Sequence, residues 1–172
     1  MGMGLGHDRL VELIYDSAEG QNAWSDVVAS LAAELSADIG HLFLLGKGGT
    51  FKDACAHGYD MRENQPYFER FQAEDPRITL GISNMGRFMS DVDVIDPRTF
   101  EASALFNEHL GPGNIRYTLF GMNVIQPDLN AAQAFMRPRS RGPFSRDEVA
   151  FLQRLQPHIS RALRLRELLS TM

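Results

Sequence analysis

The stretch that begins at Ser145 is the strongest structural signal in the sequence, because it specifies the start of a long helix. Glu148 follows Ser145 at the spacing of a capping box, in which each side chain bonds the other residue's backbone N–H. Phe144 and Val149 flank this pair as a hydrophobic staple. Apolar residues then recur every three or four positions as far as Leu169. A chain with this helix must also supply a surface against which its apolar stripe packs.

Pro157 lies about three turns into this helix and removes the backbone hydrogen bond to residue 153. We therefore expect a kink, with the first part packed on the body of the protein (1–144) and the second part turning away. The polar positions beyond the kink are mostly arginine: Arg161, Arg164 and Arg166. The segment 145–172 is thus predicted to be a connector helix whose second half is either a solvated end or part of a dimer contact.

The charge distribution separates the same two parts. Residues 1–136 hold 9 Lys and Arg against 19 Asp and Glu, whereas residues 137–172 hold 8 Arg against 3 acidic residues. An acidic body argues against direct binding of nucleic acid by the body itself. The basic end is either a solvated helix face or a surface for an anionic partner.

Before the final helix, the hydrophobic period changes repeatedly between helical and extended patterns. We predict helices over 7–19, 22–36 (with Asn22 as its cap), 61–75, 75–83 and 97–110, and strands over 38–46, 50–58, 86–89, 115–126 and 130–138. Short loops join the first and last strand pairs, which implies antiparallel pairing. Gly121 inside a strand predicts a bulge or a close backbone approach. The order predicts an α+β fold, a central antiparallel sheet with helices on both faces.

Length and composition bound the possible classes of protein. The 172 residues fit a single domain (1–172), and no apolar run approaches the ~20 residues that span a bilayer. The first residues lack a signal-peptide pattern, so we expect a cytoplasmic protein. The single cysteine, Cys55, excludes an internal disulfide, a cysteine-based zinc site and paired-cysteine redox chemistry.

The chain contains no recognisable catalytic motif. It has no phosphate-binding GxxxxGK[ST] loop, no HExxH and no GxSxG. His41, Cys55 and His57 could meet on neighbouring strands as a metal-ligand trio or a nucleophile and base, but their spacing is equally that of a polar patch beside a packed sheet. We therefore expect neither a metal site nor a cofactor, and a small enzyme of unrecognised type remains the weakest alternative.

The aromatic and methionine residues suit either a packed core or a pocket with apolar walls and a few polar groups. The strand pattern places Ile39, His41 and Phe43 on one face, and Phe51, Cys55 and His57 in one phase of the next strand. A pocket between the sheet and the helices of 61–110 would then be lined by His41, Phe43, Cys55, His57, Tyr67, Phe71, Phe106, Tyr117, Met122 and Phe135. A slip of one residue in register would replace each strand residue by its neighbour.

Four stretches together resemble a known family. The segment "RPRSRGPFSRDEVAFLQRLQPHISRALRL" (137–165) is similar to the end of the N-terminal regulatory domain of LuxR-type helix-turn-helix transcriptional regulators. The segments 22–45, "EDPR" at 74–77 and "LFNEHLGPGNIRYTLF" at 105–120 match the same pattern, and Trp24 stands at a typical position. The resemblance covers most of the chain and rests on the order and spacing of these stretches.

The resemblance implies a GAF/PAS-like sensor domain that is often dimeric through its terminal helices. It implies a homodimer that binds a small molecule, signals through the final helix, and reaches DNA only through a helix-turn-helix that this chain lacks. Known ligand types do not match: bilin-binding domains need Cys followed at once by His, whereas here Ala56 separates Cys55 from His57. Acyl-homoserine-lactone sensors carry a different Trp, Tyr and Asp pattern. The ligand stays open, and a ligand-free dimerisation module is the alternative.

Overall fold

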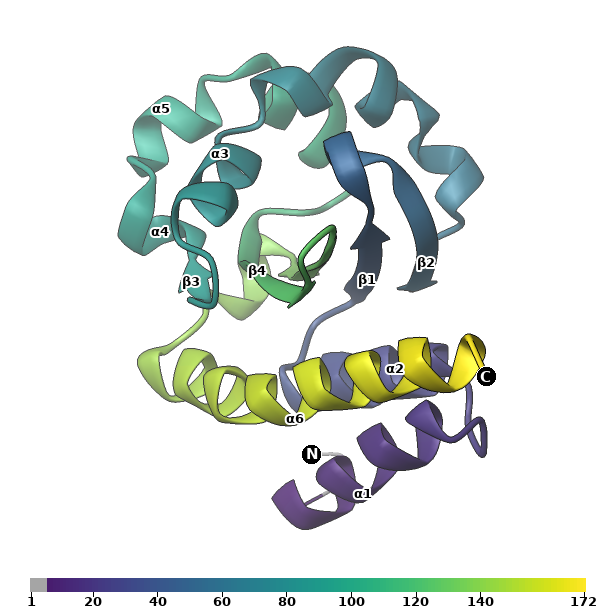
Figure 1. Ribbon diagram of the computed structural model, residues 1–172. Helices are drawn as coiled ribbons and strands as arrows, with labels where there is room; N and C mark the ends of the chain where they lie inside the picture. Colours follow the sequence, from purple (N-terminus) through teal and green to yellow (C-terminus); the bar gives the residue numbers. More distant parts are fainter. Residues whose placement is uncertain (1–5) are drawn as a thin grey trace.

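The computed structural model describes residues 6–172, and a five-stranded sheet lies at its centre (Figure 1). The strands are β1 (Ile39–Leu45), β2 (Phe51–His57), β3 (Met89–Ser90), β4 (Tyr117–Gln126) and β5 (Leu129–Arg137). Their order across the sheet is β2-β1-β5-β4-β3, and every neighbouring pair is antiparallel. The predicted α+β sheet is confirmed, although β3 is shorter than the strand expected over 86–89.

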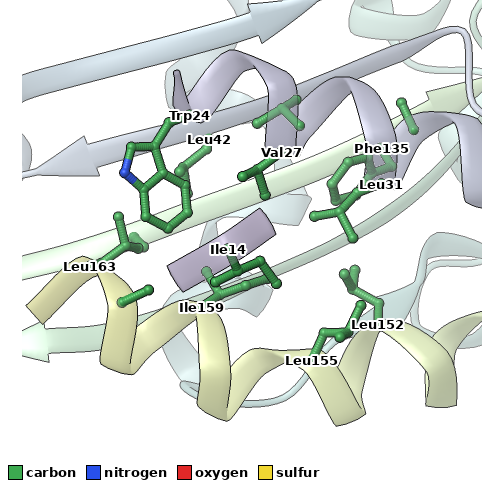
Figure 2. Close-up of a cluster of buried hydrophobic side chains, with 14 of the residues drawn as sticks. Ile14, Trp24, Val27, Leu31, Leu42, Phe135, Leu152, Leu155, Ile159 and Leu163 are labelled. Atoms are coloured by element: carbon green, nitrogen blue, oxygen red, sulfur yellow. The ribbon is translucent and has the colours of Figure 1, made fainter. Parts of the chain in front are cut away.

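One face of the sheet is covered by α2 (Trp24–Glu34) and α6 (Arg146–Ser170), and α1 (His7–Ala18) lies on the outer side of these two helices, as Figure 1 shows. Helix α1 packs on α6 and α2, while α2 lies across β1 and β2 and α6 lies across β4. Their apolar stripes meet the sheet in one large cluster of buried side chains. Figure 2 shows its centre, which includes Ile14, Trp24, Leu31, Leu42, Phe135, Leu152, Leu155, Ile159 and Leu163.

The start of α6 confirms the predicted capping box. The Ser145 hydroxyl accepts a hydrogen bond from the Glu148 backbone N–H at 3.1 Å, and the Glu148 carboxylate accepts one from the Ser145 N–H at 2.9 Å. Asn22, in contrast, does not cap α2: the N-cap is Ala23, which has no side-chain hydrogen bond. Trp24 and Val27 hold this helix on the sheet by burial instead.

The predicted turning away of α6 at Pro157 is wrong. The helix continues to Ser170, and Ile159, Leu163 and Glu167 are buried beyond the proline. Pro157 itself is exposed, so the missing hydrogen bond lies on the solvent side of the helix. The apolar stripe on the opposite side keeps packing on the layer, and this burial outweighs the local weakness.

The other face of the sheet is covered by short and irregular segments. They are η2 (Met61–Asn64), the π-helical η3 (Tyr67–Phe71), η4 (Gln72–Glu74), α3 (Pro76–Ser83), α4 (Asp91–Val94), α5 (Pro97–Glu101) and the π-helical η5 (Leu105–Leu110). The predicted helix over 97–110 is interrupted because the Ser103 hydroxyl donates to the Phe100 carbonyl at 2.6 Å and accepts from the Phe106 N–H at 3.2 Å. The segment 61–75 is broken into three turns.

Gly121 confirms the predicted close approach of two backbones. A Cβ atom there would lie 2.9 Å from both the Arg87 carbonyl oxygen and the Phe88 ring. This contact brings the segment before β3 against the middle of β4. Within residues 6–172, no helix combines the length and the apolar character needed to cross a membrane.

Candidate functional site

A cavity of about 730 Å³ lies between the sheet and the irregular segments. Its floor is one face of three adjacent strands. Because side chains alternate between the faces of a strand, alternate residues line it: Ile39, His41, Phe43 and Leu45 from β1, Thr118, Phe120 and Met122 from β4, and Asn130, Ala132, Ala134 and Met136 from β5. Apolar side chains, including those of Ala132 and Ala134, therefore form most of this wall.

The opposite wall comes from the segments between β2 and β4. Its residues include Tyr59, Asn64, Tyr67, Phe68, Ile78, Gly81, Ile82, Met85, His109, Leu110 and Ile115. Phe51, Ile82 and Met85 are large apolar residues that are exposed to solvent and also line the cavity. The volume and the mostly apolar lining are typical of sites for small organic molecules.

A buried ion pair forms the polar end of the cavity. Asp75 is the N-cap of α3 and accepts a hydrogen bond from the Arg77 backbone N–H at 2.9 Å. The Arg77 side chain turns back onto the same carboxylate, with Nε 2.9 Å from Oδ1 and Nη2 2.8 Å from Oδ2. The Tyr67 hydroxyl donates to Asp75 Oδ2 at 2.6 Å. The local Asp-Pro-Arg sequence thus builds both the helix cap and the ion pair.

Both Asp75 and Arg77 stay charged although they are buried. Burial by itself would raise the pKa of Asp75, but the Arg77 guanidinium and its hydrogen bonds hold that pKa below the usual range. For Arg77, burial opposes the charged form, yet the carboxylate of Asp75 raises its pKa. Burial, together with the Asp75 charge, also raises the pKa of Tyr67. The polar end is therefore ionised and close to neutral overall.

His41 lies beside this group and is held uncharged. Its ring stacks on Phe43 at 4.0 Å between centroids, and its Nδ1 atom lies 3.2 Å from the Tyr59 hydroxyl. Burial and then the positive charge of Arg77 lower the pKa of His41 to about 3, against a smaller opposing effect of Asp75. A neutral imidazole has one donor nitrogen and one acceptor nitrogen, and its tautomer decides which nitrogen plays which role.

The structure brings four of the predicted pocket residues together: His41, Phe43, Tyr67 and Met122 all line the cavity. The other six do not line it. Tyr117 and Phe135 belong to the cluster under α1, α2 and α6. Phe71 and Phe106 pack in a separate cluster with Phe100, Leu105 and Leu110, behind the cavity wall.

Cys55 and His57 miss the cavity because of their pairing with β1. Cys55 pairs with Leu42 and His57 pairs with Gly40, so both share the phase of β1 that faces the helical layer. The register shifts between Leu44 and Leu45, which moves Phe51 onto the cavity face. The expectation that Phe51, Cys55 and His57 share one face is therefore wrong.

The same register separates the suspected trio. His41 faces the cavity, whereas Cys55 and His57 lie in the opposite phase of the sheet. Burial, helped by the charge of Asp53, raises the pKa of Cys55 to about 11, so the thiol is protonated and unreactive. Within residues 6–172, no three His, Cys, Asp or Glu side chains lie close enough together to hold a metal ion.

Several cavity residues escaped the sequence reasoning, chiefly Tyr59, Asp75, Arg77 and His109. Asp75 was expected only to begin a helix, because Asp before Pro is the usual signal for an N-cap. An acidic and a basic residue two positions apart in a sequence usually indicate a solvent-exposed ion pair, not a buried one. Of the two partner side chains, Tyr67 lies eight residues before Asp75, whereas Thr118 comes from the distant strand β4.

Comparisons with known proteins agree on the fold. The ligand-binding domain of VqsR from Pseudomonas aeruginosa superposes with a TM-score of 0.67 at 9% identity, over 92% of this chain and 94% of that chain. CepR2 from Burkholderia cenocepacia, described as an N-acylhomoserine-lactone-dependent LuxR family transcription factor, gives 0.60 at 16% identity, over 90% of each chain. The GAF domain/HD domain protein from Geobacter sulfurreducens gives 0.61 at 18% identity, over 92% of this chain and 98% of that chain.

At sequence level, neither a family model nor a curated protein matches this chain. The structural likenesses establish a GAF-like α+β fold, with the sheet and long final helix that the sequence predicted. Two of these neighbours are described as a ligand-binding domain and as a LuxR family transcription factor, and neither description names an enzyme.

Proposed function

We propose that this chain is the regulatory sensor domain of a LuxR-type transcriptional regulator, and that it binds a small molecule in the cavity described above. The single observation that carries the proposal is a cavity of about 730 Å³ with apolar walls and one buried polar end. The polar end contains Tyr67, Asp75 and Arg77. The LuxR-type and GAF-like neighbours support the same role.

The signal would leave the cavity through α6. Two glutamines just before Pro157 tie α6 to cavity-lining parts of the chain. Gln153 accepts from the Phe88 N–H at 2.8 Å and donates to the Gly86 carbonyl at 2.9 Å, one residue after the cavity residue Met85. A ligand that shifts this segment would therefore bias α6 directly.

A second connection passes through the sheet. The buried Gln156 side chain accepts from Asn123 at 2.5 Å and from Gln133 at 2.9 Å, and Gln133 also borders the cavity. Both glutamines lie where Pro157 has removed one backbone bond of the helix, so α6 is weakest where it is tied. A ligand with different affinity for two arrangements of this region would shift their populations.

The proposal also includes a homodimer formed through the terminal helices. Leu168 and Leu169, near the end of α6, are 59% and 42% exposed, and the preceding Arg161 is exposed as well. Exposed apolar side chains on a helix support an interface with a second copy. DNA would be contacted through a separate helix-turn-helix, and the proposal assigns no catalytic activity and a cytoplasmic location to the domain.

The test is a thermal-shift screen of small amphiphilic molecules against the whole chain. A compound that binds only the folded state raises the melting temperature. At a concentration of 100 times Kd, it adds about 2.7 kcal/mol to the free energy of unfolding. Ala132→Phe should abolish the shift, because Ala132 lies in the floor of the cavity and the added ring projects into the space that a ligand would occupy. Ala33→Phe, the same change at an exposed position of α2, should leave the shift intact.

The outcomes separate the two functions considered for the chain. Stabilisation of the wild type and Ala33→Phe, but not of Ala132→Phe, supports a sensor. Equal shifts in all three proteins would place binding outside the cavity and count against it. If no compound stabilises the wild type while light scattering finds a dimer, a ligand-free dimerisation module becomes the better reading, which the exposed Leu168 and Leu169 favour.

A further inference from the structure

The carboxylate of Asp75 has no capacity left for a ligand. Oδ1 accepts from the backbone N–H of Arg77 and from its Nε, both at 2.9 Å. Oδ2 accepts from the Tyr67 hydroxyl at 2.6 Å and from Arg77 Nη2 at 2.8 Å. Asp75 is 3% exposed. A ligand N–H or O–H group would thus have to break an existing bond in order to use this carboxylate.

The guanidinium of Arg77, in contrast, has one N–H donor, on Nη1, whose partner is only a weak acceptor. Nη1 donates to the Thr118 hydroxyl at 3.0 Å and to the Met136 sulfur at 3.8 Å. A thioether sulfur is a weak acceptor, and an N–H group with only such a partner keeps much of its cost of desolvation. Arg77, Thr118 and Met136 all line the cavity, so a ligand atom can replace the sulfur.

The charges around this donor limit what the ligand can carry. Asp75 and Arg77 cancel one another, and their side chains are 1% and 10% exposed. The other charged residues of the lining, Lys47, Glu63 and Asp128, are exposed at the surface. An anionic head group would add a second anion to one buried guanidinium, and a cationic group would meet Arg77 with no free carboxylate oxygen.

We propose that Arg77 is the specificity-determining residue of the cavity, and that it selects uncharged ligands whose carbonyl oxygen replaces the Met136 sulfur as the partner of Nη1. Asp75 then acts as a positioning residue, because it holds the guanidinium and leaves Nη1 facing the cavity. This inference rests on the proposed function and names the class of molecule that the same cavity takes.

The test compares two probes of nearly equal shape in the whole protein. 2-Decanone carries a carbonyl acceptor, whereas 2-methyl-1-decene has a CH₂ group in place of that oxygen. The double variant Asp75→Asn with Arg77→Met removes both charges, so that no buried charge is left unpaired, and Asn keeps the helix cap. By calorimetric titration, the variant should lose about tenfold or more in affinity for the ketone. Its affinity for the alkene should stay within a few-fold of wild type.

A second variant covers the case in which the double variant does not fold. Met136→Leu keeps the volume and the ion pair but removes the weak acceptor of Nη1. Affinity for 2-decanone should rise by a few-fold relative to 2-methyl-1-decene, because the ketone then supplies the only replacement for the lost partner. An unchanged ratio of the two affinities would overturn the proposal.

Charged probes of matched length complete the experiment. Decanoate and decylammonium should each bind at least about tenfold more weakly than 2-decanone. Tighter binding of decanoate than of the ketone would overturn the preference for uncharged ligands. If ketone and alkene bind the wild type and the variants equally, Arg77 has no selective role although the cavity binds ligands. If no probe binds at all, both this inference and the proposed function fail.

Discussion

The two faces of the sheet differ in packing: one is covered by a continuous hydrophobic core, and the other lines a cavity. On one face, α2 and α6 pack against the sheet and α1 packs on both helices, in a single continuous cluster of buried side chains (Figure 2). On the other face, the buried apolar residues form two small clusters, around Phe100 and around Met89, and the space between them is the cavity. The first face therefore supplies most of the packing that stabilises the fold.

The covering segments differ in the same way. The packed face carries three regular helices, the longest from Arg146 to Ser170, whereas the cavity face carries 3₁₀ and π turns and helices of at most eight residues. Strand residues follow the same division: Phe135 points to the helices, and its neighbours Ala134 and Met136 point to the cavity side. The same sheet thus carries a layer of regular helices on one face and a layer of short, irregular segments around a cavity on the other.

The largest expected effect is a difference between two phenylalanines on opposite faces. Phe135→Ala should cost about 3–5 kcal/mol, because Phe135 is fully buried and packs on Gly40. Phe43→Ala should cost less than about half of that, since Phe43 already borders an open cavity and loses fewer contacts. Urea denaturation measures both values. Equal costs would show that the cavity face is as tightly packed as the helical face.

The amide cluster under α6 should behave as an all-or-none unit. Gln156→Leu removes the acceptor of both Asn123 and Gln133 and should cost about 1–3 kcal/mol, because two buried donors lose their partner. Changing all three residues to Leu should cost less than the single change, as no unpaired polar group remains. A triple variant that is less stable than Gln156→Leu would mean that shape, rather than hydrogen bonding, holds this contact.

The cavity face should also weaken first in acid. The pKa of His41 lies near 3 in the folded state, because of burial and then Arg77, against 6.5 for an unperturbed histidine. The unfolded chain therefore binds more protons between these values, and stability falls as the pH drops from about 6.5, by at most about 1.4 kcal/mol per pH unit. His41→Phe should flatten the stability curve between about pH 6.5 and pH 4.5 in urea titrations. Parallel curves for the two proteins would contradict the assignment.

The smallest effect is expected where α6 meets the edge of the sheet. Lys52 Nζ lies 2.5 Å from Glu167 Oε2, but the Lys52 side chain is 54% exposed. Lys52→Ala should lower the free energy of unfolding by less than about 1 kcal/mol. This loss should be smaller in about 0.5–1 M salt, because salt screens exposed ion pairs. Thermal melts at two salt concentrations measure it. A loss that ignores salt would point to packing of the lysine stem.

Local patterns in the sequence predicted the long strands and the helices α1, α2 and α6, but not the irregular segments over the cavity, and only part of the cavity lining. Alternation on β1 placed His41 and Phe43 on one face, and both residues line the cavity. On β4 the proposed residues Tyr117 and Met122 lie in opposite phases of the strand, and of the two Met122 lines the cavity. Alternation failed on β2, since Cys55 and His57 share the face of Leu42 and Gly40, whereas the register shift at Leu45 puts Phe51 on the opposite face. A bulge depends on how two strands fit together, and neither strand carries a local sign of it.

What the sequence by itself determined about this protein is its long strands, the helices α1, α2 and α6, and the start of α6. The capping of α6 by Ser145 and Glu148 and the apolar periodicity of the helices involve residues only a few positions apart. Both can therefore be recognised from the sequence. The tertiary structure alone decided that α6 stays on the body beyond Pro157 and that the Asp75–Arg77 pair is buried against Thr118 of β4. These outcomes depend on burial against distant segments, whose free energy exceeds the local preferences and appears only when the layers are assembled.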